Sequence, residues 1–304
     1  RSRHSMTTAA ASQQTKGNLL GIGAILLWST MASLMRLMSE AFGPLGGAAL
    51  MYTVATLFLA LLLGWPSLRH FSLRYLVVVG SLFVTYEIAL FLALAFAQNR
   101  AQAIEVAMLN HLWPCLTVLL AALLRLQRAS LWLIPGMALS LLGVGWILSG
   151  GQGLSVQSIA RNAVQNPLSY GLGVGCACVW ALYCCISKRM APTKDGTVPF
   201  FAMASAVLWI KYAFSDESLA MPGLGGAGLL VATALVIALG YAAWNQALRT
   251  GNLMMLAATS YTAPVLSSAF SSVILSTALG LSFWQGTLMV TLGSLVCWWA
   301  SRSG

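Results

Sequence analysis

The chain has 304 residues, of which 59% are hydrophobic and only 7% are charged, whereas soluble domains carry roughly 25% charged residues. This composition excludes an ordinary soluble fold. The formal net charge of +10 would by itself be compatible with a nucleic-acid partner.

Apolar runs of about 20 residues, long enough for a helix to cross a bilayer, recur along the whole sequence. We interpret them as helices because the exposed edges of a strand cannot be satisfied in lipid. The sequence therefore predicts an all-α polytopic membrane protein with ten transmembrane helices. In chain order the predicted spans are residues 17–38, 44–64, 73–97, 101–123, 130–150, 167–190, 196–213, 224–248, 253–277 and 280–300.

The polar segments outside these spans are few. Residues 1–16 form an N-terminal tail and residues 301–304 follow the last span. The tail lacks an apolar stretch, so it does not predict a secretory signal peptide. The one substantial loop, residues 151–166, is rich in Gln, Asn, Ser and Gly and is expected to be a tether rather than a domain.

Residues 17–150 weakly resemble residues 167–300. A shift of 152 residues places Gly21, Gly23, Trp28 and Arg36 on Gly173, Gly175, Trp180 and Lys188, and a shift of 150 places Pro114, Gly136 and Gly143 on Pro264, Gly286 and Gly293. Each copy holds five predicted helices, and this odd number inverts the second copy in the membrane. Many secondary transporters are built from inverted repeats that hold the substrate near mid-membrane, so transport is the leading hypothesis.

The basic residues are distributed unevenly between the two predicted membrane faces. With the N-terminus inside, the inner segments carry Arg1, Arg3, Lys16, Arg69, Arg74, Arg125, Arg128, Lys188, Arg189, Lys194, Arg249 and Arg302. The outer segments carry only Arg36, Arg100, Arg161 and Lys211. This bias predicts that both termini face the cytoplasm, and it leaves no basic groove for nucleic acid.

Two ionisable residues are predicted deep in the membrane, where insertion of a charged group costs roughly 2.5 to 3.5 kcal/mol. Glu87 lies near the middle of the third span and His111 near the middle of the fourth, so they can approach the same depth from adjacent helices. One interpretation is that Glu87 or His111 binds a substrate amine or carries a proton. The other is a hydrogen-bonded structural pair.

Two spans at equivalent repeat positions combine polar residues with a proline. They are the fourth, with Asn110, His111 and Pro114, and the ninth, with Ser260, Tyr261 and Pro264. A proline inside a helix removes a backbone hydrogen bond and kinks the helix. We therefore predict paired hinges that line a cavity, with packing alone as the alternative.

Aromatic side chains gather near mid-membrane, although Trp and Tyr normally favour the interfaces. They are Trp28 in the first span, Tyr86 and Phe91 in the third, Trp180 in the sixth, and Tyr241 and Trp244, followed by Asn245, in the eighth. Each ring alone is more often a packing residue, but together they predict a substrate pocket that accepts a flat apolar group by ring stacking.

The remaining notable residues are expected to be structural. The six cysteines all lie in apolar spans, and we predict neither a disulfide framework nor a metal site or other cofactor. Arg36 and Lys188 are expected to reach the headgroups from helix ends, and Glu105 to form a structural pair or a gate. Small residues such as Gly143 and Gly286 let helices approach closely, so the fifth and tenth spans are expected to brace the core, with contact to a second protomer as the alternative.

A resemblance to a known family rests on two parts of the sequence. The run LALAFAQNRAQAIEVAMLNHLWPCLTVLLAALL, with the later GMALSLLGVGWIL, resembles an EamA-type unit of the drug/metabolite transporter superfamily, and AAWNQALRTGNLMMLAATSYTAPVLSSAF, followed by GTLMVTLGSLVCWW, resembles a second unit. Many such units carry a Gly-Glu pair after the proline-containing helix. This chain has LLRLQRAS and STALGLSF there, so a role for that carboxylate does not carry over.

Within the superfamily, the segments GIGAILLWSTMASLMRLMSE and EVAMLNHLWPCLTVLLAALL look most like those of bacterial inner-membrane exporters of aromatic amino acids. The resemblance implies two inverted five-helix halves and export of Phe, Tyr, Trp and analogues. We expect a monomer that works by alternating access rather than an enzyme or a channel. Other amino acids, cationic drugs or small metabolites remain alternative cargoes, and the sequence does not decide whether transport is coupled to protons.

Overall fold

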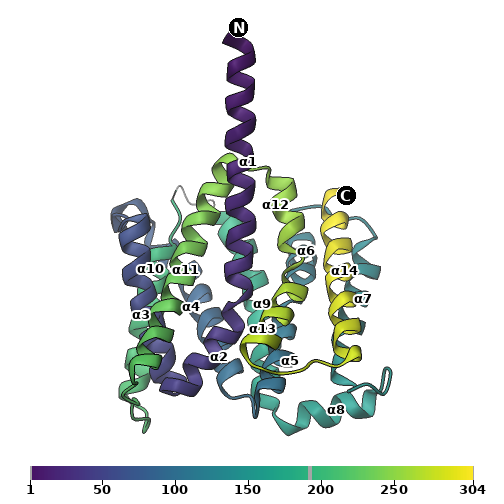
Figure 1. Cartoon of the computed structure of the whole chain (residues 1–304). Helices are drawn as coiled ribbons and strands as arrows, with labels where there is room; N and C mark the ends of the chain where they lie inside the picture. Colours follow the sequence, from purple (N-terminus) through teal and green to yellow (C-terminus); the bar gives the residue numbers. More distant parts are fainter. Residues whose placement is uncertain (1, 191–193, 304) are drawn as a thin grey trace.

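The computed structural model describes residues 2–190 and 194–303, and these residues form helices without any strand (Figure 1). The elements are α1 (Ser2–Ser29), α2 (Met31–Phe42), α3 (Pro44–Leu63), η1 (Leu68–His70), α4 (Leu73–Ala95), α5 (Arg100–Asn110), α6 (Trp113–Leu123), α7 (Leu133–Leu148), α8 (Val156–Gln165), α9 (Pro167–Met190), α10 (Thr197–Ala213), α11 (Leu224–Thr250), α12 (Leu253–Ser260), α13 (Ala263–Ile274) and α14 (Leu281–Ser303).

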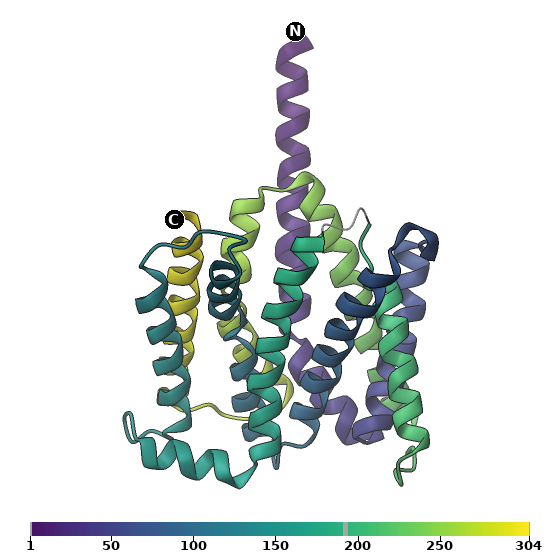
Figure 2. The same cartoon turned by 180° about the vertical axis from the view of Figure 1, so that it is seen from behind.

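The helices confirm the all-helical fold class. Seven helical segments of the described chain are long and apolar enough to cross a membrane. Three further predicted spans correspond to the shorter apolar helices Leu133–Leu148, Thr197–Ala213 and Ala263–Ile274. The described parts of both ends of the chain lie on one side of the bundle, called here the proximal end, and α8 lies at the opposite, distal end (Figures 1 and 2).

Two polar segments contain helix that the sequence analysis did not expect. The tail continues α1 back to Ser2, and this part projects beyond the bundle (Figure 1). The loop between the halves contains α8, whose first turn is capped by the Ser155 side chain accepting from the Ser158 amide. The Asn162 side chain donates to the Leu148 carbonyl, so this segment is held against the end of α7 rather than being a free tether.

Three membrane-embedded helices are interrupted rather than continuous. The breaks fall at Thr30 between α1 and α2, at His111–Leu112 between α5 and α6, and at Tyr261–Thr262 between α12 and α13. Pro114 and Pro264 lie in the first turn of the helix after each of the last two breaks, where a missing amide hydrogen costs nothing. The backbone at these breaks stays close to helical, with Thr30, Leu112 and Thr262 in the right-handed helical region, so each break is local.

The helices pack in pairs that join the two parts of the chain: α7 with α14, α3 with α10, α1 with α11 and α4 with α9. The contact of α7 with α14 is close because small residues meet there. A Cβ atom added at Gly143 would lie 2.7 Å from the Gly286 carbonyl oxygen, and one added at Gly136 would lie 3.1 Å from the Gly293 carbonyl oxygen. Only glycine permits this backbone approach.

The prediction that the chain has no disulfide framework was wrong. Cys115 of α6 and Cys297 of α14 are joined by a disulfide, with Cα atoms 5.3 Å apart. The two residues are separated by 182 positions in the sequence, so the pairing follows from the packing of α6 on α14 and has no local sequence signal. Cys176, Cys178, Cys184 and Cys185 are free thiols.

The prediction that Arg36 reaches the headgroups was also wrong. Arg36 is only 9% exposed, and its Nη1 atom donates to the carbonyl oxygens of Leu94 and Ala97, each at 2.8 Å. Glu105 forms a structural pair as expected, because it accepts a hydrogen bond of 2.7 Å from the Tyr170 hydroxyl.

Candidate functional site

The bundle contains a partly open cavity of about 430 Å³, within the range of small-molecule sites. Residues from α1, α2, α4, α5, α6, α9, α10, α11, α12 and α13 line it. The structure brings nine of the predicted substrate-site residues together here: Trp28, Tyr86, Glu87, Asn110, His111, Trp180, Tyr241, Trp244 and Ser260.

Three predicted site residues lie outside the lining of this cavity. Phe91 is fully buried in the core. Tyr261 lies between the rings of Trp113 and Trp298, with centroids 6.4 Å from each. Asn245 follows Trp244 on α11 and is partly buried. Tyr261 therefore supports a ring of the wall, whereas Phe91 belongs to the packing behind it.

The aromatic wall consists of two groups of rings. Trp28 of α1 packs against Tyr241 of α11, with centroids 5.0 Å apart and an edge-on angle of 64°. Trp180 of α9 packs against Tyr86 of α4 at 4.6 Å. Trp28 and Trp180, which are aligned by the shift of 152 residues in the sequence, therefore both line the cavity, each packed against a tyrosine.

Backbone packing behind the wall fixes one of these rings. Gly240 of α11 lies against Trp28, and a Cβ atom added at Gly240 would lie 2.9 Å from Cδ1 of the indole and closer still to its Nε1 atom. The glycine thus leaves room for the ring to lie flat on α11. Trp244, one turn further along α11, packs on the same ring at 5.6 Å.

The polar groups of the cavity are few and well defined. Glu87 is 7% exposed, and its carboxylate accepts a hydrogen bond of 2.5 Å from the Tyr52 hydroxyl. The Asn110 side-chain amide donates to the Tyr86 hydroxyl at 3.1 Å. Within the described residues His111 has no side-chain hydrogen bond, and none joins it to Glu87. The proposed structural pair of Glu87 and His111 is therefore absent, and Tyr52 is the partner of Glu87.

The helix breaks add further polar groups to the lining. His111 follows the last residue of α5 and Ser260 ends α12. In a continuous helix the carbonyl groups of Asn110 and Ser260 would accept from the amides of residues 114 and 264. Both of these residues are prolines, which have no amide hydrogen to donate. The Ser260 hydroxyl donates to the Ala257 carbonyl at 2.6 Å. The cavity therefore meets interrupted backbone at mid-bundle depth, where transporters commonly hold their substrates.

Several lining residues were missed from the sequence. Trp113 and Phe201 line the cavity, and Tyr52 holds the carboxylate of Glu87 from outside the lining. Trp113 was detectable because it precedes Pro114 at the break. Tyr52 lies mid-span like the aromatic residues that were chosen, so the same criterion applied to the second span would have found it. For Phe201 the sequence gives no comparable signal.

The arrangement suits a small molecule with one flat apolar part and one polar part. Indole and phenol rings surround most of the space, while Glu87 supplies a carboxylate and Asn110 an amide. Within residues 2–190 and 194–303 no group of three His, Cys, Asp or Glu side chains is placed to hold a metal ion. A chain of apolar helices around such a central cavity has the architecture of a membrane transporter.

Comparisons with known proteins identify the class more closely. The profile of the EamA-like transporter family matches residues 15–149. The chain is 42% identical over 287 residues to the "Aromatic amino acid exporter YddG" of Salmonella typhimurium, covering 94% of this chain and 98% of that protein. It is likewise 42% identical over 289 residues to the protein of the same name from Escherichia coli, covering 95% and 99% of the two chains. The chain belongs to the EamA-like transporter family, which confirms the prediction of a membrane transporter rather than an enzyme.

A solved structure described only as the crystal structure of a protein shares the fold. It superposes with a TM-score of 0.65 over 94% of this chain and 98% of that chain, at 24% sequence identity. At this identity the likeness supports the arrangement of helices alone.

Proposed function

We propose that this chain is a secondary transporter of the bacterial inner membrane that exports phenylalanine, tyrosine, tryptophan and their analogues. The observation that carries the proposal is the central cavity of about 430 Å³ with paired indole rings on its walls. The names of the two relatives at 42% identity, both aromatic amino acid exporters, support the same cargo.

A bound amino acid would place its ring between the walls and its charged end among the polar groups. The ring contacts Trp28 and Trp180, which offer edge-to-face or offset-stacked partners. Glu87 receives the ammonium group, since a carboxylate is the natural partner of an amine. Asn110 and His111 receive the substrate carboxylate. Tyr86, Tyr241, Trp244 and Ser260 complete the contact surface, while Phe91, Asn245 and Tyr261 support it from behind.

The proposed architecture is two inverted five-helix repeats, residues 17–150 and 167–300, with a tail of residues 1–16, a linker of residues 151–166 and a C-terminal segment of residues 301–304. The packing of α1 on α11 and of α4 on α9 supports it, because an inverted twofold relation exchanges these two pairs. The contacts of α3 with α10 and of α7 with α14 are the pairs that such an axis maps onto themselves.

The proposed orientation places both termini in the cytoplasm. The basic residues expected inside belong to segments at the proximal end, for example Arg74 at the start of α4 and Arg302 near the end of α14, and this agrees with the positive-inside rule. Arg1, one of the residues on which the prediction rests, and Gly304 lie outside the described residues. The distal end, with Arg36 and Arg100, then faces the periplasm. We propose that the monomer is the functional unit.

The proposed mechanism is alternating access around the central cavity. The breaks before Pro114 and Pro264 lie in two cavity-lining helices, one from each proposed repeat. Small changes of the backbone angles at these breaks would tilt the two parts of each helix relative to each other. Because α6 and α13 both follow such breaks, the two prolines are the proposed flexure points.

The proposal is tested by counterflow in liposomes. Purified protein is reconstituted, loaded with unlabelled tryptophan, and assayed for uptake of labelled tryptophan, with phenylalanine, tyrosine, leucine, lysine and a quaternary ammonium compound as competitors. We expect competition by the aromatic amino acids and little by the others. Absence of tryptophan flux, or equal competition by the cation, would favour the alternative of an exporter of other amino acids, cationic drugs or small metabolites.

A further inference from the structure

We propose that Arg36, Glu40 and Arg100 form an ionic clamp that closes the central cavity toward the distal end, and that this clamp must open for substrate to leave on that side. The inference rests on the alternating-access part of the proposed function and on its orientation. It does not depend on which molecule is carried.

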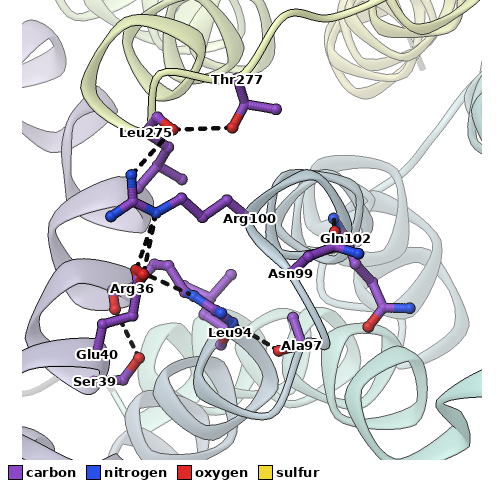
Figure 3. Close-up of polar contacts among 10 residues, drawn as sticks. All are labelled: Arg36, Ser39, Glu40, Leu94, Ala97, Asn99, Arg100, Gln102, Leu275 and Thr277. Carbon is purple, nitrogen blue, oxygen red and sulfur yellow. Dashed lines mark hydrogen bonds and ion pairs between the residues drawn. The ribbon is translucent and has the colours of Figure 1, made fainter.

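The clamp is built around one carboxylate (Figure 3). Arg100 donates from Nε to both oxygens of Glu40 at 3.1 Å, and the Nε atom of Arg36 lies 3.6 Å from the same carboxylate. Glu40 thus neutralises two guanidinium groups from two different helices, α2 and α5. Both ion pairs found among the described residues lie in this cluster.

The two arginines extend the clamp to two more helices through carbonyl oxygens. Arg36 donates to Leu94 in the last turn of α4 and to Ala97 just beyond it, each at 2.8 Å. Arg100 donates from Nη1 to the carbonyl of Leu275, just past the end of α13, at 3.2 Å (Figure 3). Helix carbonyls at a C-terminus lack intrahelical partners and carry partial negative charge. The arginines therefore bind α4 and α13 at their most electronegative ends.

All four clamped helices line the cavity, and the clamp contacts lie on the distal side of lining residues of α2, α4 and α13. Leu90 of α4 lines the cavity and lies four residues, about 6 Å along the helix, before Leu94. Met35 of α2 lines it directly beside Arg36. On α13, Ser267 lines the cavity and precedes Leu275 by about two turns. Opening a distal path between these helices requires that the contacts of Glu40 and the arginines separate.

Among the described residues, the proximal end has no equivalent clamp. Lys188, the repeat counterpart of Arg36, is exposed and takes part in neither ion pair of the described residues. In the described part of the chain, ion pairs therefore join helices at the distal end alone. A clamp that is partly accessible to water is suited to a gate, since exposed ion pairs contribute only about 0.2 to 1 kcal/mol each and can be broken at each transport cycle.

The test measures access to the cavity from the periplasmic side, independently of cargo. The variant Ser267→Cys places a thiol on the cavity lining, and spheroplasts are treated with a membrane-impermeant thiol reagent. The background from native cysteines is measured on the same chain without this substitution. Adding Glu40→Gln is expected to raise the labelling rate of the introduced thiol about fivefold, the factor that corresponds to about 1 kcal/mol.

Two further variants make the result specific. Arg100→Gln should give the same increase, and combining it with Glu40→Gln should add little, because both remove one interaction. Arg100 has a side chain that is 39% exposed, so its variant provides the test if Glu40→Gln does not fold. The control is Glu217→Gln, a distal carboxylate that accepts from the Leu45 and Gly46 amides instead, and it should leave the rate unchanged.

Labelling rates within twofold of the parent for both Glu40→Gln and Arg100→Gln would overturn the clamp. If labelling responds as expected but tryptophan counterflow is absent, the cargo assignment fails and the clamp stands. If counterflow is present but labelling does not respond, the clamp fails while the proposed function stands.

Discussion

The substitution Gly240→Ala tests whether the position of Trp28 determines substrate binding. Gly240 makes no contact with substrate in the proposed pose, but its new Cβ atom would meet the indole at 2.9 Å from Cδ1. Carbon atoms at optimal separation are about 3.5 to 4.0 Å apart. The ring therefore has to move by at least about 0.5 Å, and the space available for that movement is the cavity itself.

The expected effect is a loss of affinity rather than a loss of fold. Adding one methyl group to a packed site costs about 1 to 3 kcal/mol, and here the displaced ring also shifts against Tyr241 and Trp244. If substrate binding loses this free energy, the KM for tryptophan rises by about 5-fold to 150-fold. Phenylalanine has a smaller ring and should be affected less. Counterflow kinetics for both substrates provide the measurement.

Two variants separate this reasoning from a general effect on α11. Gly228→Ala lies on the same helix with no atom within 4 Å of the added Cβ, so its kinetics should match the parent. Trp28→Phe removes the part of the ring that Gly240 accommodates, so adding Gly240→Ala to Trp28→Phe should have a much smaller effect than adding it to the parent. Equal KM values for the Gly240 and Gly228 variants would refute the reasoning.

Three other predictions concern the cavity and its scaffold. Trp180→Leu should raise the KM for tryptophan by up to about tenfold, the worth of an aromatic pair, whereas Trp299→Ala, which is exposed on the outside of the bundle, should not; a similar loss in both would contradict a specific wall. Glu87→Gln should reduce tryptophan counterflow by about tenfold, as expected for a lost charged hydrogen bond, and should spare competition by a tryptophan analogue without the amine; unchanged flux would remove its proposed role. Gly143→Ala should lower the free energy of unfolding by about 1 to 3 kcal/mol because its Cβ atom meets the Gly286 backbone. Gly145→Ala, whose Cβ atom meets only movable side-chain ends at 3.2 and 3.4 Å, should be neutral. Equal melting curves for the two variants would contradict the close packing.

The helices themselves were predictable because membrane burial imposes a simple pattern. Apolar runs of bilayer length gave spans whose ends agree closely with the observed helices, as for α9 at Pro167–Met190. Proline at a first helical position, as in Pro44 and Pro167, marks two of these starts in the sequence. The helical tail and α8 were missed, since polar sequence gives no hydrophobic signal from which to predict a helix.

Those cavity residues could be predicted that stand out by their position near the middle of a membrane span. Trp28 and Glu87 were chosen because polar and amphipathic side chains are costly or unusual near mid-membrane, and both line the cavity. Which residues contact each other was not predictable. Glu87 pairs with Tyr52 rather than His111 because α3 packs beside α4. The predicted depth of a residue in the membrane does not tell which helices are neighbours.

The same reason explains the errors at Arg36 and at the disulfide. A cation at a helix end has two ways to satisfy its charge, the headgroups or a protein partner, and the choice depends on which carbonyl groups lie within reach. For Arg36 these belong to Leu94 and Ala97, 58 and 61 residues away. Cys115 and Cys297 are more distant still in sequence. Long-range packing determines both the partners of Arg36 and the disulfide. Local sequence properties therefore predicted the more common outcomes, a cation at the headgroups and free cysteines.

The differences between the two halves carry functional information that their similarity does not. The first helix of the first half breaks at Thr30, where Ser29 and Thr30 side chains bond to carbonyls of the preceding turn, and this pattern bends helices. Its counterpart α9 is continuous through Trp180. The break lets α2 turn at the distal end and carry Arg36 to the end of α4, whereas the unbroken α9 leaves Lys188 exposed. The proposed alternating-access mechanism needs unequal ends in each state, and the helix break together with the proposed clamp would supply that inequality.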